Sequence, residues 1–406
     1  MPALSSCFSA SRYQWRYQHM VFLTILSAVC LCVLYTLLYI RPDASEWRKV
    51  QRLAGGRSFL ETIKNETLGF QKILCINLPS RTDKRDAIML ASSLTQFRVD
   101  WVDGISGDAM DPKAYPPRLD DSGRPSMLPG EIGSWRAHTN AIQKVVSERL
   151  TSALILEDDV DWDVTLKNQL QEFALGSRAV QKDGESSETP YGEDWDLLWL
   201  GHCGIKCHSN DPFYMLHDQT AVPYAHLPRY WQGPAVHETV EDRNDTRIVC
   251  GIKESVCSYA YAIKYHAAQK LLAALSVSPS DQAMPPGEPI IFDVLLGRLC
   301  GTGYLKCISS YPSLMGVWKP AGSRSKHSDI QDLKDPAPTE TPSEVAGSLG
   351  VMYSTMLNLP ALLDGRSLVH SAVADVLSPE LKLSEVQLTE GGLYKSDHGR
   401  IYSVTG

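Results

Sequence analysis

The alternation of short apolar runs with amphipathic helical patterns constrains the fold of this chain more than any other feature of its sequence. Residues 73–78, 97–102 and 153–156 are apolar runs of strand length. Apolar residues at helical spacing follow Arg81 and appear again from Glu131 onward. This order predicts an α/β fold built on a mainly parallel sheet.

Further elements of both kinds follow along the chain. The pattern predicts strands at 197–201 and 304–308 and helices at 264–275 and 290–299. Three polar segments, 105–129, 177–192 and 331–342, interrupt these elements and predict loops or insertions.

An uncharged apolar segment occupies residues 20–40. As a helix it would be roughly 31 Å long, enough to cross a bilayer. A cleaved signal peptide is the competing interpretation, but the apolar run is longer than such peptides need, so we expect a retained transmembrane helix. The predicted organisation is a cytoplasmic tail (1–19), a signal anchor (20–40), a stalk (41–69), a large body (70–330) and a C-terminal extension (331–406) that packs on the body and is partly flexible.

Sequons and cysteines indicate where the body lies. Basic residues flank the apolar segment on both sides and do not decide its orientation. Asn65 and Asn244 each begin an Asn-x-Thr sequon, which is glycosylated only in the secretory lumen. Seven cysteines follow the stalk, an odd number, and in an oxidising lumen we favour disulfides of unknown pairing. A zinc site at Cys203 and Cys207, beside His202 and His208, is the alternative. The prediction is a single-pass type II protein of the Golgi or endoplasmic reticulum membrane with a luminal body.

The charge composition argues against a nucleic-acid partner. The chain has 406 residues, with 39 basic and 47 acidic side chains and a formal charge of −8. Nucleic-acid binding needs a basic stripe, and none stands out. The predicted partners are a bilayer, through residues 20–40, and small molecules or glycans.

A cluster of carboxylates follows the third strand candidate. Five of the seven residues from Glu157 to Asp163 are acidic. Ligands of open α/β sheets bind beyond the carboxyl ends of the strands, and hard divalent ions prefer such oxygen ligands. A solvated acidic turn is the alternative, but the apolar strand directly before the cluster favours a metal site. A bound Mn²⁺ or Mg²⁺ could hold the diphosphate of a nucleotide-sugar donor, so glycosyl transfer fits this site.

Six separated motifs together resemble glycosyltransferase family 25 in its fungal branch, a family that includes lipopolysaccharide and procollagen galactosyltransferases. In chain order they are ILCINLPSRTDKRD, WVDGISG, LPGEIGSWRAH, ALILEDDVDWD, DWDLLWLGHCG and GVMYSTMLNLPALL. The resemblance extends from about residue 72 to 364. It implies a GT-A-like nucleotide-sugar-binding fold at 70–330, metal dependence, inverting transfer and a UDP donor, often carrying galactose. The acceptor would be a hydroxyl of a glycan, protein or lipid.

The resemblance also implies roles for single residues. The first motif would contact the nucleotide, with its arginines facing the diphosphate, through Asn77, Arg81, Asp83 and Arg85. In the acidic motif, Asp159 would bind the metal, with Glu157 as a further candidate ligand, and Glu157 or Asp158 would contact the ribose or a metal-bound water. Asp161 is a further candidate metal ligand, although Asp161 and Asp163 could instead support the site from behind or lie in solvent.

Four further candidates complete the predicted site. Asp293, with Glu288 as second choice, is the candidate general base that inversion requires. His327 could complete the metal shell, and His138 could orient donor or acceptor, but a surface and a packed histidine are the respective alternatives.

Asp194 and Asp196 form a rival Asp-x-Asp pair. They precede a strand rather than follow one, which places them away from the expected ligand edge.

Two other functions remain open at this stage. A glycoside hydrolase also uses paired carboxylates, but it needs neither metal nor nucleotide. A non-catalytic luminal protein that binds carbohydrate or calcium is the other alternative. UDP binding with and without Mn²⁺ separates the three.

Overall fold

The structure is a computed structural model, and it describes the main body of the chain. The described residues are 20–22, 59–116, 127–181, 189–227, 233–240, 243–277, 291–322, 328–330, 343–374, 376–397 and 400–404. The chain divides into two compact units, Met1–Ser58 and Phe59–Gly406. The predicted transmembrane span lies outside the described residues except for 20–22. The described part of the chain contains no helix with the length and apolar character needed to cross a membrane.

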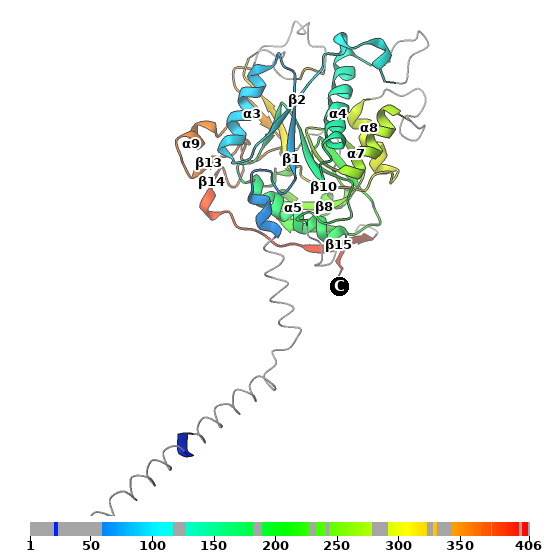
Figure 1. Ribbon diagram of the computed structural model, residues 1–406. Helices are drawn as coiled ribbons and strands as arrows, with labels where there is room; N and C mark the ends of the chain where they lie inside the picture. Colours follow the sequence, from blue (N-terminus) through cyan, green and yellow to red (C-terminus); the bar gives the residue numbers. More distant parts are fainter. Residues whose placement is uncertain are drawn as a thin grey trace, which may run out of the picture. The chain divides into compact units, whose positions relative to one another are not determined.

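The second unit is built on one large sheet flanked by helices (Figure 1). Its main path runs in the order β16-β15-β7-β8-β10-β5-β9-β3-β1-β2. The strands on this path are β1 (Lys72–Asn77), β2 (Asp100–Asp103), β3 (Ser152–Glu157), β5 (Leu197–Gly201), β7 (Phe213–His217), β8 (Thr246–Val256), β9 (Ala260–Lys264), β10 (Cys307–Tyr311), β15 (Gly392–Asp397) and β16 (Arg400–Ser403). Joined to its sides are β4 (Val160–Trp162), β6 (Gly204–Cys207), β11 (Met315–Lys319) and β12 (Gly347–Leu349), while β13 (Leu368–His370) and β14 (Glu380–Lys382) form a separate pair.

The prediction of a mainly parallel sheet is wrong, because the sheet is mixed. Strand β1 is parallel to β2 and β3, and β10 is parallel to β5, but β9 lies antiparallel between β3 and β5. Strand β8 is antiparallel to β6, β7 and β10. Parallel neighbours need long crossovers, which are usually helical. Of the described residues between β5 and β9, only α6 (Ala235–Glu238) is α-helical, so this part of the sheet forms by reversals.

The helices cover both faces of the sheet. Predicted helices are found at α3 (Thr82–Leu94), α4 (Pro129–Ser147), α7 (Tyr265–Leu272) and α8 (Phe292–Gly301). Helix α5 (Leu166–Gln181), which overlaps the predicted polar insertion, and the short α9 (Leu359–Leu363) were not predicted. Strand β2 begins at Asp100 rather than at residue 97, and β10 begins at Cys307 rather than at residue 304.

Successive side chains of the central strands enter different cores. Ile73 and Cys75 of β1 pack with α3 and α5, whereas Leu74 and Ile76 pack with α4, α7 and α8. Side chains alternate across a strand, so a continuous apolar run is the pattern of a strand covered on both faces. The result is a three-layer α/β/α arrangement, with the carboxyl ends of β1, β2, β3 and β5 at one edge.

Disulfides hold the antiparallel part of the sheet. Cys203 is bonded to Cys257, Cys207 to Cys250 and Cys300 to Cys307. Cys75 in β1 is a buried free thiol. The prediction of disulfides is confirmed, and Cys75 is the odd cysteine of the seven. The alternative zinc site is wrong because Cys203 and Cys207 are both oxidised.

The compact unit extends beyond the predicted boundaries of the body. Leu60, Ile63 and Leu68, which the sequence assigned to the stalk, are buried in the same core as β1. After residue 342, Met352 and Tyr353 are buried beside β8, and β15 pairs with β7.

Candidate functional site

The candidate site lies where β1 and β3 end. Strand β1 ends at Asn77 and β3 ends at Glu157, and the acidic turn follows at Asp158 and Asp159. The backbone N–H of Glu157 donates to Tyr259 O (2.9 Å), in the loop before β9, and the N–H of Trp318 in β11 donates to Asp159 O (2.7 Å). Two neighbouring strands therefore fix the acidic turn at the carboxyl edge of the sheet.

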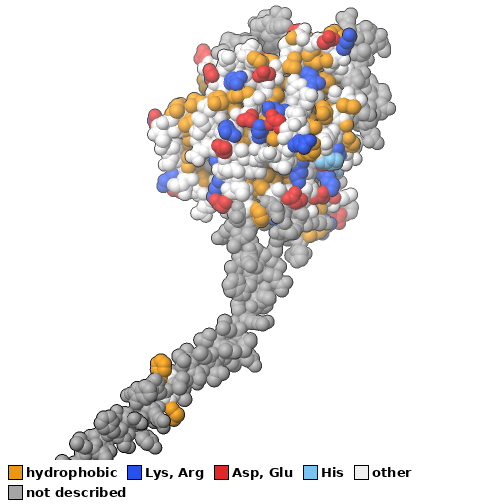
Figure 2. Space-filling model, in the orientation of Figure 1, with side chains coloured by type: hydrophobic (Ala, Val, Ile, Leu, Met, Phe, Trp, Pro, Cys, Tyr) orange, Lys and Arg blue, Asp and Glu red, His pale blue; other side chains and the backbone are white. Residues whose placement is uncertain are grey.

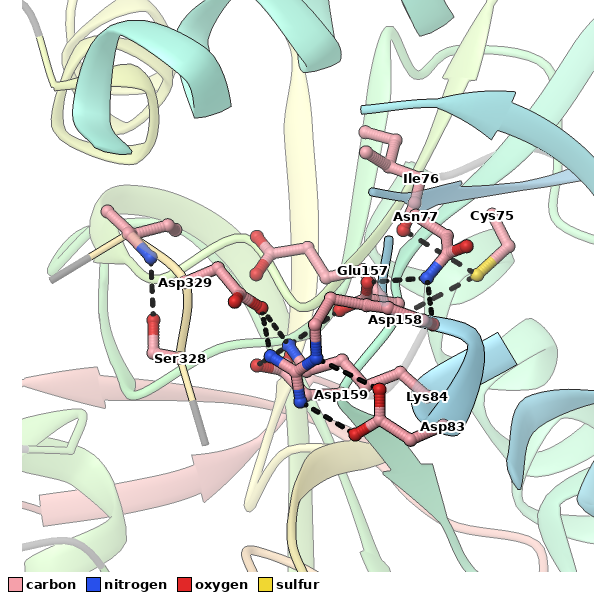
Figure 3. A network of polar contacts seen from close by, with 12 residues as sticks. Cys75, Ile76, Asn77, Asp83, Lys84, Glu157, Asp158, Asp159, Ser328 and Asp329 are labelled. Atoms are coloured by element: carbon pink, nitrogen blue, oxygen red, sulfur yellow. Dashed lines mark hydrogen bonds and ion pairs between the residues drawn. The ribbon is translucent and has the colours of Figure 1, made fainter. Parts of the chain in front are cut away.

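A buried lysine lies among these carboxylates (Figure 3). Lys84 Nζ is 2.8 Å from Asp158 Oδ1, 2.9 Å from Asp329 Oδ2 and 3.5 Å from Asp159 Oδ2. Its side chain is only 5% exposed. Burial lowers the pKa of Lys84, but Asp159, Asp158 and Asp329 together raise it above the usual value, so the lysine stays charged.

The first motif supports this cluster from the side of β1 and α3. Asn77 Nδ2 donates to Asp158 Oδ2 (2.9 Å) and to Arg81 O (3.0 Å). The Arg81 guanidinium bridges Asp83 (2.9 Å) and Asp329 (2.5 Å). The structure thus brings Asn77 to the acidic turn and links Arg81 and Asp83 to Asp329 beside it, while their contact with a nucleotide stays a prediction.

Glu157 is held by a different set of partners. Ser258 Oγ donates to Glu157 Oε1 (2.7 Å), and His138 Nε2 lies 3.3 Å from the same oxygen. Burial opposes ionisation of Glu157, but the contacts with His138 and Ser258 hold its pKa below the usual value. The His138 ring stacks on Phe292 at 4.1 Å between centroids, so this histidine is packed and also contacts the acidic cluster.

The pKa values of Asp158 and Asp159 are raised, whereas that of Glu157 is lowered. Burial raises the pKa of Asp158, and it raises the pKa of Asp159 to about 7 against the lowering effect of Lys84. Asp159 Oδ1 is buried and has no hydrogen-bond partner among the described residues. An ionised carboxylate in this position lacks a counter-charge on one oxygen.

Two cavities meet at Glu157 and Asp159. The first has a volume of about 330 Å³, and the second about 360 Å³. The first is lined by Lys84, Asp158 and Asp329, by the loop after β2 and by the start of α4. The second is lined by Ser258 and Asp293, by the apolar rings of Phe292 and Trp318, and by β11. Glu157 and Asp159 therefore line both cavities.

Two glycines allow the walls of the first cavity to approach each other closely. A Cβ on Gly133 would lie 2.4 Å from Ile105 O, and one on Gly130 would lie 2.1 Å from Ile330 O. Any side chain would push apart α4 and the segments at Ile105 and Ile330, because contacts this short do not occur. The glycines of the LPGEIG motif thus set the spacing of the cavity walls.

The structure places some predicted site residues elsewhere. Arg85 lies over the Trp101 ring at 4.5 Å and does not line either cavity. Asp161 accepts hydrogen bonds from the N–H groups of Trp162 and Met356 and from Ser354 Oγ, and Asp163 binds Thr165 and the N–H of Tyr353. Both aspartates are fully buried, so they neither lie in solvent nor join the cluster at Asp159.

The remaining candidates divide between the second cavity and the undescribed residues. Asp293 is the second residue of helix α8. It lines the second cavity and accepts a hydrogen bond from the N–H of Cys257 (2.7 Å). Glu288 and His327 lie outside the described residues.

The rival pair Asp194 and Asp196 lies at the other end of β5. Asp196 is paired with Lys270 at 2.8 Å, and Asp194 with Lys306. These carboxylates lie before the strand and contribute to neither of the two cavities that meet at Glu157.

Sequence reasoning missed Lys84, Asp329 and Ser258. A signal for Lys84 was present, because Lys84, Ile88 and Ala91 are spaced by four and three residues and share the buried face of α3. Asp329 and Ser258 approach the cluster only through the tertiary fold, and no local pattern marks them.

The described residues fit a metal ion only in part. No three of their His, Cys, Asp or Glu side chains form a group that could hold a metal ion. The unpartnered Asp159 Oδ1 beside Asp158 offers one free oxygen ligand, so further ligands would have to come from a bound nucleotide or from water.

Comparisons with known proteins identify several relatives of this chain. Procollagen galactosyltransferase 1 of Danio rerio is 24% identical over 241 residues, covering 57% of this chain and 33% of the relative. Procollagen galactosyltransferase 2 of Mus musculus is 26% identical over 144 residues, covering 34% and 21%. Inactive glycosyltransferase 25 family member 3 of Homo sapiens is 24% identical over 239 residues, covering 56% and 32%. The chain thus spans a third or less of the length of these relatives.

The family model described as "Glycosyltransferase family 25 (LPS biosynthesis protein)" matches residues 70–284. This range begins before β1 and includes Lys84, the acidic turn and Ser258. Because the match covers more than half of the chain, the chain belongs to glycosyltransferase family 25.

Proposed function

We propose that this chain is an inverting glycosyltransferase that moves a sugar from a UDP donor to a hydroxyl acceptor. One observation carries the proposal: two cavities of similar volume meet at Glu157 and Asp159. Direct transfer requires donor and acceptor to lie side by side with their reacting atoms in contact. Two adjoining cavities that share carboxylates at their junction satisfy this requirement.

The first cavity suits a nucleotide diphosphate that binds together with a metal ion, because five carboxylates, from Asp108, Glu157, Asp158, Asp159 and Asp329, line it beside the ammonium of Lys84. Lys84 is charged and lines it, and the start of α4, from Pro129 to Gly133, forms another wall. Ammonium groups and helix N-termini both stabilise phosphate. Arg81, which binds Asp329 beside this cavity, adds positive charge near the same wall.

The second cavity suits a neutral or cationic acceptor. Four carboxylates line it, from Glu131, Glu157, Asp159 and Asp293, against the single ammonium of Lys319. An anionic acceptor would be repelled. The rings of Trp318 and Phe292 offer apolar surface of the kind that packs against a sugar ring.

Asp293 is the proposed general base. The acceptor hydroxyl attacks the anomeric carbon of the donor and forms the new glycosidic bond, and its proton passes to the Asp293 carboxylate. The bond between the anomeric carbon and the phosphate oxygen breaks, and UDP leaves with the electron pair. The Cys257 N–H holds Asp293 in place, and the disulfide from Cys257 to Cys203 fixes that donor.

Asp159 and Asp158 would hold Mn²⁺ or Mg²⁺. The unpartnered Asp159 Oδ1 fits such an ion, and nucleotide oxygens would complete its coordination. When bound, the ion supplies Lewis-acid stabilisation of the charge that develops on the leaving diphosphate.

The relatives and the surface suggest the sugar and the compartment. Two of the relatives named above carry the name procollagen galactosyltransferase, so we propose galactose as the sugar.

Three disulfides and two exposed sequon asparagines, Asn65 and Asn244, support a luminal body. We propose that residues 20–40 anchor it as a type II protein in the Golgi or endoplasmic reticulum membrane. On the face that Figure 2 shows, acidic and basic side chains are interspersed rather than segregated by sign.

A donor screen tests the proposal. The purified full-length chain is incubated with UDP-sugars and Mn²⁺, and UDP release is measured with Asp159→Asn as the control. We expect release from one donor by the wild type and its loss in the variant. UDP binding that needs metal supports the transferase. Hydrolysis of glycosides without UDP binding would identify a hydrolase, and calcium or glycan binding without turnover would identify a non-catalytic binding protein.

A further inference from the structure

Lys84 neutralises the acidic turn in a way that a bound cation would. Its ammonium lies within 3.5 Å of Asp158 and Asp159, the two carboxylates that the proposed function assigns to the metal. The contact with Asp159 is the longer of the two, and the second oxygen of that carboxylate has no partner among the described residues. The lysine therefore satisfies Asp158 well and Asp159 incompletely.

The lysine and a divalent ion cannot share these oxygens at low energy. Two cations on the same pair of carboxylates repel each other strongly in a buried site, because the effective dielectric constant is low. Lys84 is anchored in its present position by a third carboxylate, Asp329, at 2.9 Å. Binding of an ion to Asp159 must therefore displace the ammonium or work against it.

A diphosphate in the first cavity could bind the displaced ammonium. Lys84 and its three carboxylate partners all line the first cavity, which the proposed function assigns to the donor. A diphosphate in that cavity offers oxygens that an ammonium binds as a point charge. Because Lys84 already lines this cavity, the exchange needs only a change of its side-chain rotamer on helix α3.

We propose that Lys84 is an exchangeable counter-cation: it occupies the metal's place on Asp158 and Asp159 in the ligand-free protein and passes to the donor diphosphate when nucleotide and metal bind. This inference rests on the proposed function and adds a donor-binding residue to it. Metal alone then binds weakly because it must expel Lys84, whereas metal binds well once nucleotide has taken the ammonium. By linkage, each ligand strengthens the binding of the other.

The test measures binding rather than turnover, on the full-length chain. Lys84→Met removes the charge and keeps the length of the side chain. We expect its affinity for Mn²⁺ alone, measured by electron paramagnetic resonance of the free ion, to rise about tenfold. We expect its affinity for UDP alone, measured by calorimetry, to fall by a similar factor of about ten. Lys84→Arg should stay near the wild type in both measurements.

Lys72→Met is the matched control. Lys72 also lies between two carboxylates, Asp100 and Glu148, but at the opposite end of β1. This variant should leave both affinities unchanged. If Lys84→Met does not fold, Lys84→Met/Asp329→Asn removes one charge of each sign and carries the same two expectations.

Opposite shifts in the two affinities are the signature of exchange, and a merely structural lysine would not produce them. A folded Lys84→Met protein that binds Mn²⁺ no better than the wild type, or UDP equally well, would overturn the inference while the wild type's own UDP binding leaves the proposed function intact. A wild type that binds no UDP with or without Mn²⁺ would overturn both.

Discussion

Two buried charge clusters in this molecule differ in how completely their polar atoms are paired. In the first, around Lys84, one ammonium serves three carboxylates, and Asp159 Oδ1 has no partner among the described residues. In the second, between β7 and β8, Arg247 Nε donates to Asp218 Oδ2 (2.6 Å), and its Nη1 donates to Pro312 O and Ser313 O. Asp218 Oδ1 also accepts from the N–H and hydroxyl of Thr220.

This difference in pairing distinguishes a cluster that could bind a ligand from a cluster that stabilises the fold. A buried charge is tolerated when hydrogen bonds replace the water that it has lost. Arg247 and Asp218 meet this condition from within the protein, and although burial opposes ionisation of Asp218, Arg247 and Thr220 bring its pKa below the usual value. Asp159 does not meet it, and burial raises its pKa to about 7. The unpaired cluster therefore leaves an oxygen free for the ligand that the proposed function places there, whereas the paired cluster leaves none.

The largest expected effect is on turnover at the unpaired cluster. Asp159→Asn should lower kcat on the order of 10³-fold, since it removes the carboxylate that would hold the metal ion at the donor diphosphate. Its thermal midpoint should stay equal to or exceed that of the wild type, because a poorly paired buried carboxylate is replaced by a neutral group. The measurements are UDP release and thermal unfolding.

Asp196→Asn provides the control for that prediction. Asp196 belongs to the rival Asp-x-Asp pair and is bound to Lys270 at the opposite edge of the sheet. Near-wild-type turnover in Asp159→Asn, together with loss in Asp196→Asn, would move the metal site to Asp196.

The paired cluster should show the reverse behaviour. Asp218→Asn leaves Arg247 buried without its counter-charge and should cost about 3–5 kcal/mol in the free energy of unfolding. Turnover per folded molecule should not change, because neither residue lines the two cavities of the candidate site. Urea unfolding of both aspartate variants measures the contrast. Equal stability losses in Asp218→Asn and Asp159→Asn would remove the distinction between the clusters.

The disulfides reinforce the region of the paired cluster. The Cys207–Cys250 bond joins β6 to β8 and encloses a sequence separation of 43 residues. Replacing both cysteines by alanine should cost about 3 kcal/mol, because the unfolded chain regains conformational freedom. Cys75→Ala in β1 tests the other region, where no disulfide is present among the described residues, and should lose only about 1 kcal/mol from a small cavity. A reductant should destabilise the wild type and Cys75→Ala alike; insensitivity of both would contradict the assigned bonds.

How much the sequence could predict depends on whether a feature arises from neighbouring residues or from distant ones. Strands β1 and β3 are continuous apolar runs followed by polar residues, so their positions, and the carboxylates at their ends, follow from local pattern. Helix α5 also had a local signal, with buried Leu166, Leu170 and Phe173 at helical spacing, which a polar stretch after residue 177 obscured. These features depend on a few consecutive residues.

Features that depend on distant residues were not predictable. The antiparallel insertion of β9 between β3 and β5 depends on the path of the chain through β6, β7 and β8. Disulfide pairing and the approach of Asp329 to Lys84 arise only from that path. Lys84 reads locally as one charge among several at a helix start, and its function as a counter-cation requires knowledge of what α3 packs against.

The last expected effect depends on pH and comes from a carboxylate beside the paired cluster that lacks such pairing. Glu172 in α5 accepts one hydrogen bond, from the N–H of Thr389 (2.8 Å), and burial raises its pKa from 4.5 to about 8. The unfolded chain releases this proton near pH 4.5, whereas the folded protein retains it until about pH 8. The contribution of Glu172 to stability is thus fully present below pH 4.5 and is lost as the pH rises to about 8. Glu172→Gln keeps the shape without the titration, so its stability relative to wild type should rise between pH 5 and pH 8 by at most about 3–4 kcal/mol.

A carboxylate of opposite behaviour provides the control for this prediction. Contacts with Lys144 and Lys72 lower the pKa of Glu148, so its contribution is present above its unfolded pKa and is lost as the pH falls through the lower folded value. Glu148→Gln should therefore lose stability relative to wild type at pH 8 and recover part of it in acid. Between pH 5 and pH 8 the thermal midpoint of Glu172→Gln relative to wild type should rise, while that of Glu148→Gln should stay nearly constant and recover only below pH 4.5. Parallel curves would show that pairing, the property that separates the two clusters, does not control stability at Glu172.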